Sequence, residues 1–310
     1  MELRQPPERP TQSFMPAWID AHFISLLNGL AIGALLFIVA VGMSLIFGMM
    51  DVLNLAHGVL FLAGAYTAWW IVGEAPSWPR FAAALAVAGA AGALAGVGLS
   101  LLVGRLARRS HLDQALLTLG LALIGADLLS IAFGDDVHSI KAPPGLDGST
   151  AVLGKIYPVY RLVLIGLGAA LAAVVHVVVE RTSLGALVRA TVADRHMVAA
   201  IGVDERKVKL VVFAVGAVLA TTAGVLGMPV LGVGPGLDST ELILALVVVV
   251  IGGLGSVRGA LFGALVIGEI WSLGRDVLAD VAPFVQFGAL ALVLVLRPRG
   301  LFGAATGARS

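Results

Sequence analysis

The stretch Phe23–Met50, FISLLNGLAIGALLFIVAVGMSLIFGMM, contains no Asp, Glu, Lys or Arg. A helix needs about 20 predominantly apolar residues to cross the hydrocarbon core of a bilayer, and this stretch exceeds that length. Two other stretches, Phe81–Gly104 and Leu210–Leu237, are also free of charged residues. The sequence therefore predicts an all-α protein, a polytopic transmembrane helical bundle.

The composition excludes a water-soluble globule. Of the 310 residues, 59% are hydrophobic and 13% are charged, and the mean hydropathy is +1.01. Soluble domains carry about 25% charged residues, so there is too little charge here to cover a soluble surface. The absence of cysteine excludes disulfides and thiolate-held metals. A net charge of +1 does not indicate a nucleic-acid partner.

The hydropathy pattern predicts eight to ten membrane segments, including broken or re-entrant helices near Gly252–Gly259. The apolar blocks are 23–50, 52–73, 81–104, 114–133, 159–179, 210–230, 239–256, 258–273 and 281–296. Their continuity favours helices over the alternating strands of a β-barrel. We expect a polar N-terminal tail at 1–21, a transmembrane domain at 22–303 and a C-terminal tail at 304–310. The first block is too long to be the apolar core of a signal peptide.

The connections between successive apolar blocks form two alternating sets. One set contains thirteen basic residues and the other contains five. Because cytoplasmic loops are enriched in Lys and Arg, the richer set is predicted to be cytoplasmic and the C-terminus to lie inside. The loop Gly134–Pro158 is then the largest external one. The side of the N-terminus remains open, because Arg4 and Arg9 are balanced by acidic neighbours.

The chain contains 39 glycines, many of them inside apolar blocks. Small residues four positions apart let helix backbones approach closely in lipid, so they predict a tightly packed bundle. Such pairs are Gly29/Gly33, Gly92/Gly96 and Gly259/Gly263.

Asp51, Asn54, His57 and the adjacent Gly58 interrupt a long apolar region. On a helix, the first three would share one face. Polar groups at membrane depth usually face a bundle interior or a wet cavity, so one interpretation is a broken helix that lines a substrate pathway. The other is a turn between two ordinary spans, capped by Asn54 and His57.

Glu180–Lys209 is the longest hydrophilic stretch on the predicted cytoplasmic side, with six basic and four acidic residues. It predicts short amphipathic helices with Thr182 or Ser183 as the N-cap and Gly202 as the stop. The segment is either a docking element for a soluble partner or an ordinary solvated loop.

The glycine-rich segment Val250–Gly263 lacks the residue order of a phosphate-binding loop, so we expect a helix break at Gly252, Gly253 and Gly255 instead. The intramembrane candidates Asp127, His176, Glu241 and Glu269 are too scattered to predict an ion relay. No nucleophile–base pair or metal-ligand cluster stands out in the sequence. We therefore expect no enzyme activity, no ATPase site, no metal and no cofactor bound to this chain.

Three segments together resemble the LivH-type permeases of branched-chain amino-acid ABC transporters. They are LNGLAIGALLFIVAVGMSLIFGMMDVLNLAHGVLFLAGAY (Leu27–Tyr66), the segment Ser183–Leu226, and VVVVIGGLGSVRGALFGALVIG together with the ending RPRGLFG (Arg297–Gly303). The motif NLAHG favours the LivH-type half over the sister LivM-type half. The resemblance extends from Leu26 to Gly303.

The resemblance implies an importer permease in the bacterial cytoplasmic membrane, which passes branched-chain amino acids or a related small solute such as urea or an amide. The implied partners are a LivM-type second permease, two cytoplasmic ATPase subunits that bind the ATP, and a periplasmic substrate-binding protein. The segment 180–209 would dock into the ATPase. Its implied contact residues are Leu184, Gly185, Arg189, Asp194, Met197, Ile201, Gly202 and Val203.

Two other classes of protein compete with this interpretation. A secondary transporter or channel would need its own coupling-ion site, which the scattered acidic residues do not support. A membrane-embedded enzyme would need a catalytic constellation. The sequence does not determine the exact substrate. It also leaves open whether the assembly is a homodimer or a heterodimer, and which glycine face forms the subunit interface.

Overall fold

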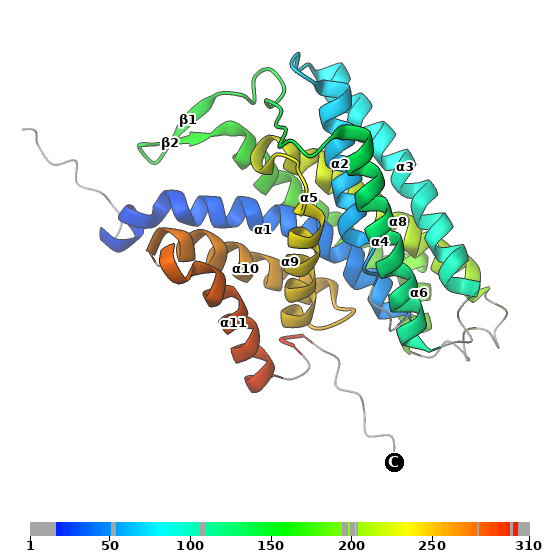
Figure 1. The fold of residues 1–310 in the computed structure, drawn as a ribbon. Helices are drawn as coiled ribbons and strands as arrows, with labels where there is room; N and C mark the ends of the chain where they lie inside the picture. Colours follow the sequence, from blue (N-terminus) through cyan, green and yellow to red (C-terminus); the bar gives the residue numbers. More distant parts are fainter. Residues whose placement is uncertain are drawn as a thin grey trace, which may run out of the picture.

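The computed structural model describes residues 17–50, 54–105, 110–193, 198, 202, 204–277, 279–297 and 300–302. It is a helical bundle with one small β-hairpin (Figure 1). The helices are α1 (Ala17–Met50), α2 (His57–Val72), α3 (Trp78–Arg105), α4 (His111–Phe133), α5 (Val159–Arg181), α6 (Ser183–Ala193), α8 (Glu205–Leu231), α9 (Leu237–Gly252), α10 (Val257–Val277) and α11 (Ala282–Leu296). The polytopic all-α prediction is confirmed.

Within the described residues, six helices are long and apolar enough to cross a membrane: α1, α3, α4, α5, α8 and α10. The helices α2 and α9 have 16 residues each and α11 has 15, so they are shorter than the ~20 residues of a full span. α1 begins at Ala17, inside the stretch expected to be a polar tail. Asp20 lies in its first turn, where a carboxylate interacts favourably with the helix dipole.

Ion pairs show which helix ends lie together. At one end, Lys155 Nζ is 3.4 Å from Asp20 Oδ1, and His22 Nδ1 is 3.0 Å from Asp276 Oδ2. At the opposite end, Arg258 lies 3.3 Å from Glu180. The second end carries the basic-rich connections that are predicted to be cytoplasmic, so the start of α1 lies at the end predicted to be external.

The helix α1 lies at the centre of the bundle, between α10, α8, α9 and α5 (Figure 1). Its middle is almost fully buried, including Phe37, Val39 and Ala40. A Cβ atom on Gly33 would lie 2.9 Å from the carbonyl oxygen of Ala264 in α10, and one on Gly42 would lie 2.8 Å from that of Gly216 in α8. These glycines allow the backbones to approach more closely than any side chain would permit.

The predicted pair Gly92/Gly96 faces α8 in the same way. A Cβ atom on Gly96 would lie 2.5 Å from the carbonyl oxygen of Phe213 and 2.7 Å from the Cα atom of Ala214. Gly98 follows two residues later on the same helix, yet a Cβ atom there would meet no described atom within 4 Å. Gly96 is therefore required for the close approach of α3 to α8, whereas Gly98 lies in the same helix without such a contact.

The external loop contains a hairpin that the sequence analysis did not predict. Strands β1 (Ser149–Val152) and β2 (Lys155–Pro158) pair antiparallel, with Thr150 opposite Tyr157. Leu153 and Gly154 form the turn, both with positive φ. Tyr157 is fully buried and anchors the hairpin to the bundle, and its burial raises the pKa of the phenol.

We expect Gly96→Ala to destabilise the protein by about 1–3 kcal/mol, because the added methyl group meets backbone atoms that cannot rotate away. Gly98→Ala is the matched control. It should be neutral or stabilising by up to about 1 kcal/mol, since alanine has the higher helix propensity. The free energy of unfolding in detergent is measured for both variants and for the unmodified protein. Equal effects at the two positions would contradict the assigned α3–α8 contact.

Candidate functional site

Two polar residues at the start of α2, Asn54 and His57, are buried inside the chain. His57 is fully buried, with Nε2 3.0 Å from the carbonyl oxygen of Val39 in α1. Asn54 is 3% exposed, and its Oδ1 accepts a hydrogen bond of 3.2 Å from the backbone N–H of Ala56. The third polar residue of the predicted pathway, Asp51, lies outside the described residues.

His57 and Gly58 lie where several helices meet. A Cβ atom on Gly42 of α1 would lie 3.2 Å from His57 Cε1. A Cβ atom on Gly58 would lie 2.9 Å from the Cβ atom of Leu242 in α9. In this conformation the junction is packed protein, and a role for Asn54, His57 and Gly58 in the substrate pathway stays a prediction.

The glycine-rich segment between α9 and α10 is a tight turn at the cytoplasmic end. α9 ends at Gly252, and Gly253 and Gly255 adopt φ angles of 102° and 77°, which side-chain-bearing residues rarely adopt. A Cβ atom on Gly48 would lie 3.0 Å from the Cα atom of Gly255. The turn therefore lies against the cytoplasmic end of α1.

The chain near Arg297 returns to the same turn. The backbone N–H of Leu301 donates to the carbonyl oxygen of Ile251 at 2.8 Å, and that of Phe302 donates to Gly252 at 2.9 Å. The aromatic ring of Phe302 stacks on that of Phe262 in α10, with centroids 5.1 Å apart. The break between α9 and α10 is thus held from two sides.

The predicted docking segment is described only in part. Thr182 caps α6, because its Oγ1 accepts a hydrogen bond of 3.1 Å from the N–H of Gly185. Gly185 is buried and Arg189 is exposed, and Gly202 lies in an exposed turn with φ of 85°. The other implied contact residues, Asp194, Met197, Ile201 and Val203 and the side chain of Leu184, lie outside the described residues.

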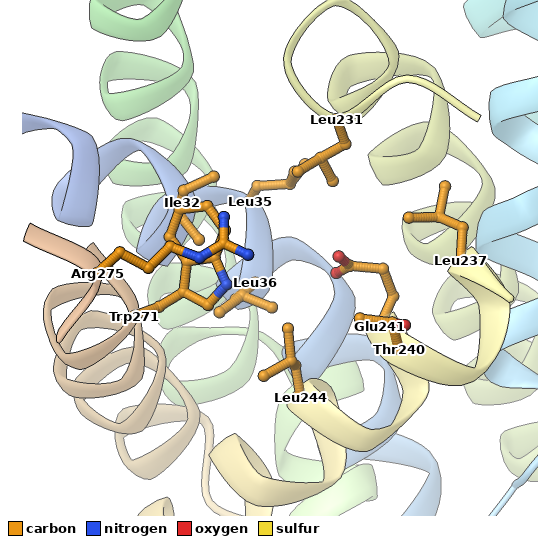
Figure 2. Close-up of a pocket in the computed structure, with 10 residues that line it drawn as sticks. All are labelled: Ile32, Leu35, Leu36, Leu231, Leu237, Thr240, Glu241, Leu244, Trp271 and Arg275. Carbon is orange, nitrogen blue, oxygen red and sulfur yellow. The ribbon is translucent and has the colours of Figure 1, made fainter. Parts of the chain in front are cut away.

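A pocket of about 150 Å³ opens between α1, the end of α8, α9 and α10 (Figure 2). Its lining residues are Ile32, Leu35, Leu36, Leu231, Leu237, Thr240, Glu241, Leu244, Trp271 and Arg275. The pocket lies toward the external end, since Leu231 and Leu237 flank the external α8–α9 connection. A single water molecule requires about 10–15 Å³ of such space, so the pocket has room for a small organic solute.

Two charged side chains line the pocket from different helices. Glu241 of α9 is 4% exposed, and its Oε2 has no hydrogen-bond partner among the described residues. Arg275 of α10 is exposed, with its guanidinium carbon 4.1 Å from the centroid of the Trp271 ring. Figure 2 shows the carboxylate of Glu241 directed toward the space between the two helices. The remaining wall is mostly aliphatic.

Sequence reasoning did not find this pocket. It weighed Glu241 only as a member of an ion relay and did not connect it with Arg275, 34 positions away. The local signal was the pair Thr240–Glu241, which interrupts an otherwise apolar block. Among the other relay candidates, Asp127 and His176 are exposed and Glu269 is half-buried beside Gly29. In the part of the chain that the structure describes, no group of three or more His, Asp or Glu residues could hold a metal ion.

We expect His57→Leu to lower stability by about 1–3 kcal/mol, because the contact with the carbonyl oxygen of Val39 is lost in a fully buried site. The control is His176→Leu on the exposed face of α5, which should change stability by no more than about 0.5 kcal/mol. The free energy of unfolding of both variants, measured in detergent, tests this expectation. A tolerated His57→Leu would show that the hydrogen bond does not hold α1 and α2 together.

Comparison with known proteins gives one family and several relatives. The sequence model of the family described as "Branched-chain amino acid transport system / permease component" matches residues 25–296. The high-affinity branched-chain amino acid transport system permease protein BraD of Pseudomonas aeruginosa is 29% identical, over 91% of this chain and 96% of its own. The corresponding LivH proteins of Salmonella typhimurium and Escherichia coli are 26% identical, over 90% of this chain and 94% of theirs.

One solved structure is similar at lower identity. PsaBC from Streptococcus pneumoniae in complex with Fab shares 14% of its sequence, with a TM-score of 0.48. The match covers 90% of this chain and 93% of that one.

Proposed function

We propose a substrate and an assembly for this chain, which belongs to the branched-chain amino acid transport permease family, whose sequence model matches residues 25–296. It is a multi-pass permease subunit of an ABC importer in the bacterial cytoplasmic membrane. We propose that its substrates are branched-chain amino acids, the solutes named for BraD and LivH. The observation that carries the proposal is the family match over nearly every described helix.

The proposed assembly contains this chain, a second permease of the LivM type, two cytoplasmic ATPase subunits and a periplasmic binding protein. Importer permeases of this family act with ATPase and binding-protein partners. In the proposal, ATP binds to the ATPase subunits alone, and this chain holds no cofactor. The cap at Thr182 supports a defined orientation of α6 at the cytoplasmic end, as a docking segment requires.

Reconstitution tests the energy source. In liposomes with an imposed proton or sodium gradient, this chain alone should not accumulate L-leucine. Adding the second permease, the ATPase subunits, the binding protein and ATP should give concentrative uptake. Uptake by the lone chain would favour a secondary transporter, and a complete assembly that carries urea or an amide but no L-leucine would reject the proposed substrate.

A second experiment tests docking through the segment Glu180–Lys209. Met197→Asp should reduce co-purification with the ATPase subunits and uncouple ATP hydrolysis from uptake, because a carboxylate buried at a contact without a partner costs about 1–3 kcal/mol or more. Ile156→Asp, on the exposed face of the external hairpin, is the control and should leave co-purification unchanged. Unaltered assembly and coupling in Met197→Asp would remove this residue from the docking surface.

A further inference from the structure

We infer that the pocket between α1, α9 and α10 is a transient binding site for a zwitterionic, aliphatic amino acid. In this site Glu241 binds the ammonium group, Arg275 binds the carboxylate, and the leucine-rich wall holds the side chain. The inference rests on the proposed function and assigns to that function a place in the chain where the substrate is bound.

The first observation is a buried acidic side chain without a partner. Glu241 is 4% exposed, and its Oε2 makes no hydrogen bond within the described ranges. Burying a carboxylate is costly unless a counter-charge or hydrogen-bond donors compensate. No ion pair with Glu241 occurs among the described residues. Because its carboxylate is directed into the pocket (Figure 2), a bound ammonium group would provide the missing partner.

The second observation is a basic side chain on the opposite wall. The guanidinium carbon of Arg275 lies 4.1 Å from the centroid of the Trp271 ring, and Arg275 forms no ion pair within the described ranges. The adjacent Asp276 is already engaged, because it accepts hydrogen bonds of 3.0 Å from His22 and 2.6 Å from Ser25 in α1. Arg275 is therefore available to a carboxylate, which guanidinium binds with two parallel hydrogen bonds.

The third observation is the character of the remaining wall. Ile32, Leu35 and Leu36 of α1 form one side, and Leu231, Leu237 and Leu244 complete the enclosure. Such a wall binds a branched aliphatic side chain by removing apolar surface from water, at about 25 cal/mol per Å². A neutral solute such as urea would leave Glu241 and Arg275 without counter-charges and would gain nothing from six aliphatic side chains. The pocket therefore fits a branched-chain amino acid better than an amide.

The position of the pocket suits a site on the way in. It lies toward the external end, so a solute released by the binding protein would reach it before the cytoplasmic turn at Gly253–Gly255. A passage needs binding that is favourable enough for entry and weak enough for exit. A partly exposed site with one buried charge fulfils that requirement.

Photolabelling of the complete transporter tests the site. The probe is a leucine analogue whose side chain carries a diazirine, applied to the resting transporter without binding protein. Mass spectrometry should locate the adduct on pocket residues, Leu36, Leu244 or Trp271 among them. Excess L-leucine should suppress the label, whereas leucinamide, which lacks the carboxylate, and 4-methylpentanoate, which lacks the ammonium group, should compete about tenfold less well.

Variants test the two charges. Glu241→Gln and Arg275→Gln should each lower labelling and the initial rate of L-leucine uptake about tenfold, with unchanged melting temperature and ATPase association. Glu269→Gln removes a second carboxyl group whose Oε2 has no partner among the described residues and which does not line the pocket, and Lys141→Gln removes an exposed charge of the predicted external loop. Both controls should label and transport like the unmodified protein.

The outcomes separate this inference from the proposed function. If the unmodified transporter carries L-leucine but the label falls elsewhere, or if both charge variants behave like the controls, the site is wrong and the function stands. If 4-methylpentanoate competes as well as L-leucine, the pocket recognises only apolar surface and the assigned charges are wrong. If the complete transporter carries no L-leucine, the proposed substrate fails and the site fails with it.

Discussion

Close backbone contact around α1 is the constraint on which the rest of the structure depends. In a bilayer every backbone polar group must be satisfied within the protein, so the spanning elements are helices. Lipid tails are as apolar as leucine, and helix association therefore depends on close packing and interhelical hydrogen bonds. Gly33 and Gly42 provide that packing against α10 and α8.

The two candidate functional regions lie at the two ends of this central helix. At the cytoplasmic end, Gly48 of α1 contacts the turn at Gly255, and the chain at Leu301–Phe302 bonds to the last residues of α9. Toward the external end, Ile32 and Leu35 line the pocket. The same rigid helix therefore contacts both the pocket and the cytoplasmic turn, which gives the two regions a common structural support.

Charge has little part in holding the bundle together. The ion pairs Lys155–Asp20, His22–Asp276 and Arg258–Glu180 lie at helix ends and are partly or largely exposed. Pairs of this kind contribute about 0–1 kcal/mol each. Against this background Glu241 is an exception, because it is a buried acidic side chain whose Oε2 has no hydrogen-bond partner among the described residues.

The class of the fold, the positions of most helices and the family could be predicted from the amino-acid sequence. Uninterrupted apolar runs such as Phe23–Met50 have one stable structure in a bilayer, and the glycine run after Val250 predicted the end of α9 without any knowledge of tertiary contacts. Basic residues predicted the sides of the loops, since that preference depends on local composition. The hairpin 149–158 was missed because its strands have only four residues each, and because the burial of Tyr157 and the pair Lys155–Asp20 that hold it depend on residues far apart in the sequence.

The tertiary structure alone decided which residues meet. It placed the start of α1 beside Lys155 and Asp276, at the end predicted to be external, where the balanced local charge had left the side of the N-terminus open. In the structure His57 is buried against Val39 and does not face an open passage. Glu241 and Arg275, from different helices, line the same pocket. Hydropathy and periodicity indicate whether a segment forms a helix in the bilayer and which of its faces is apolar. A binding site depends instead on the packing angle and the register between helices. These are set by contacts, many of them at glycines, between residues far apart in the sequence.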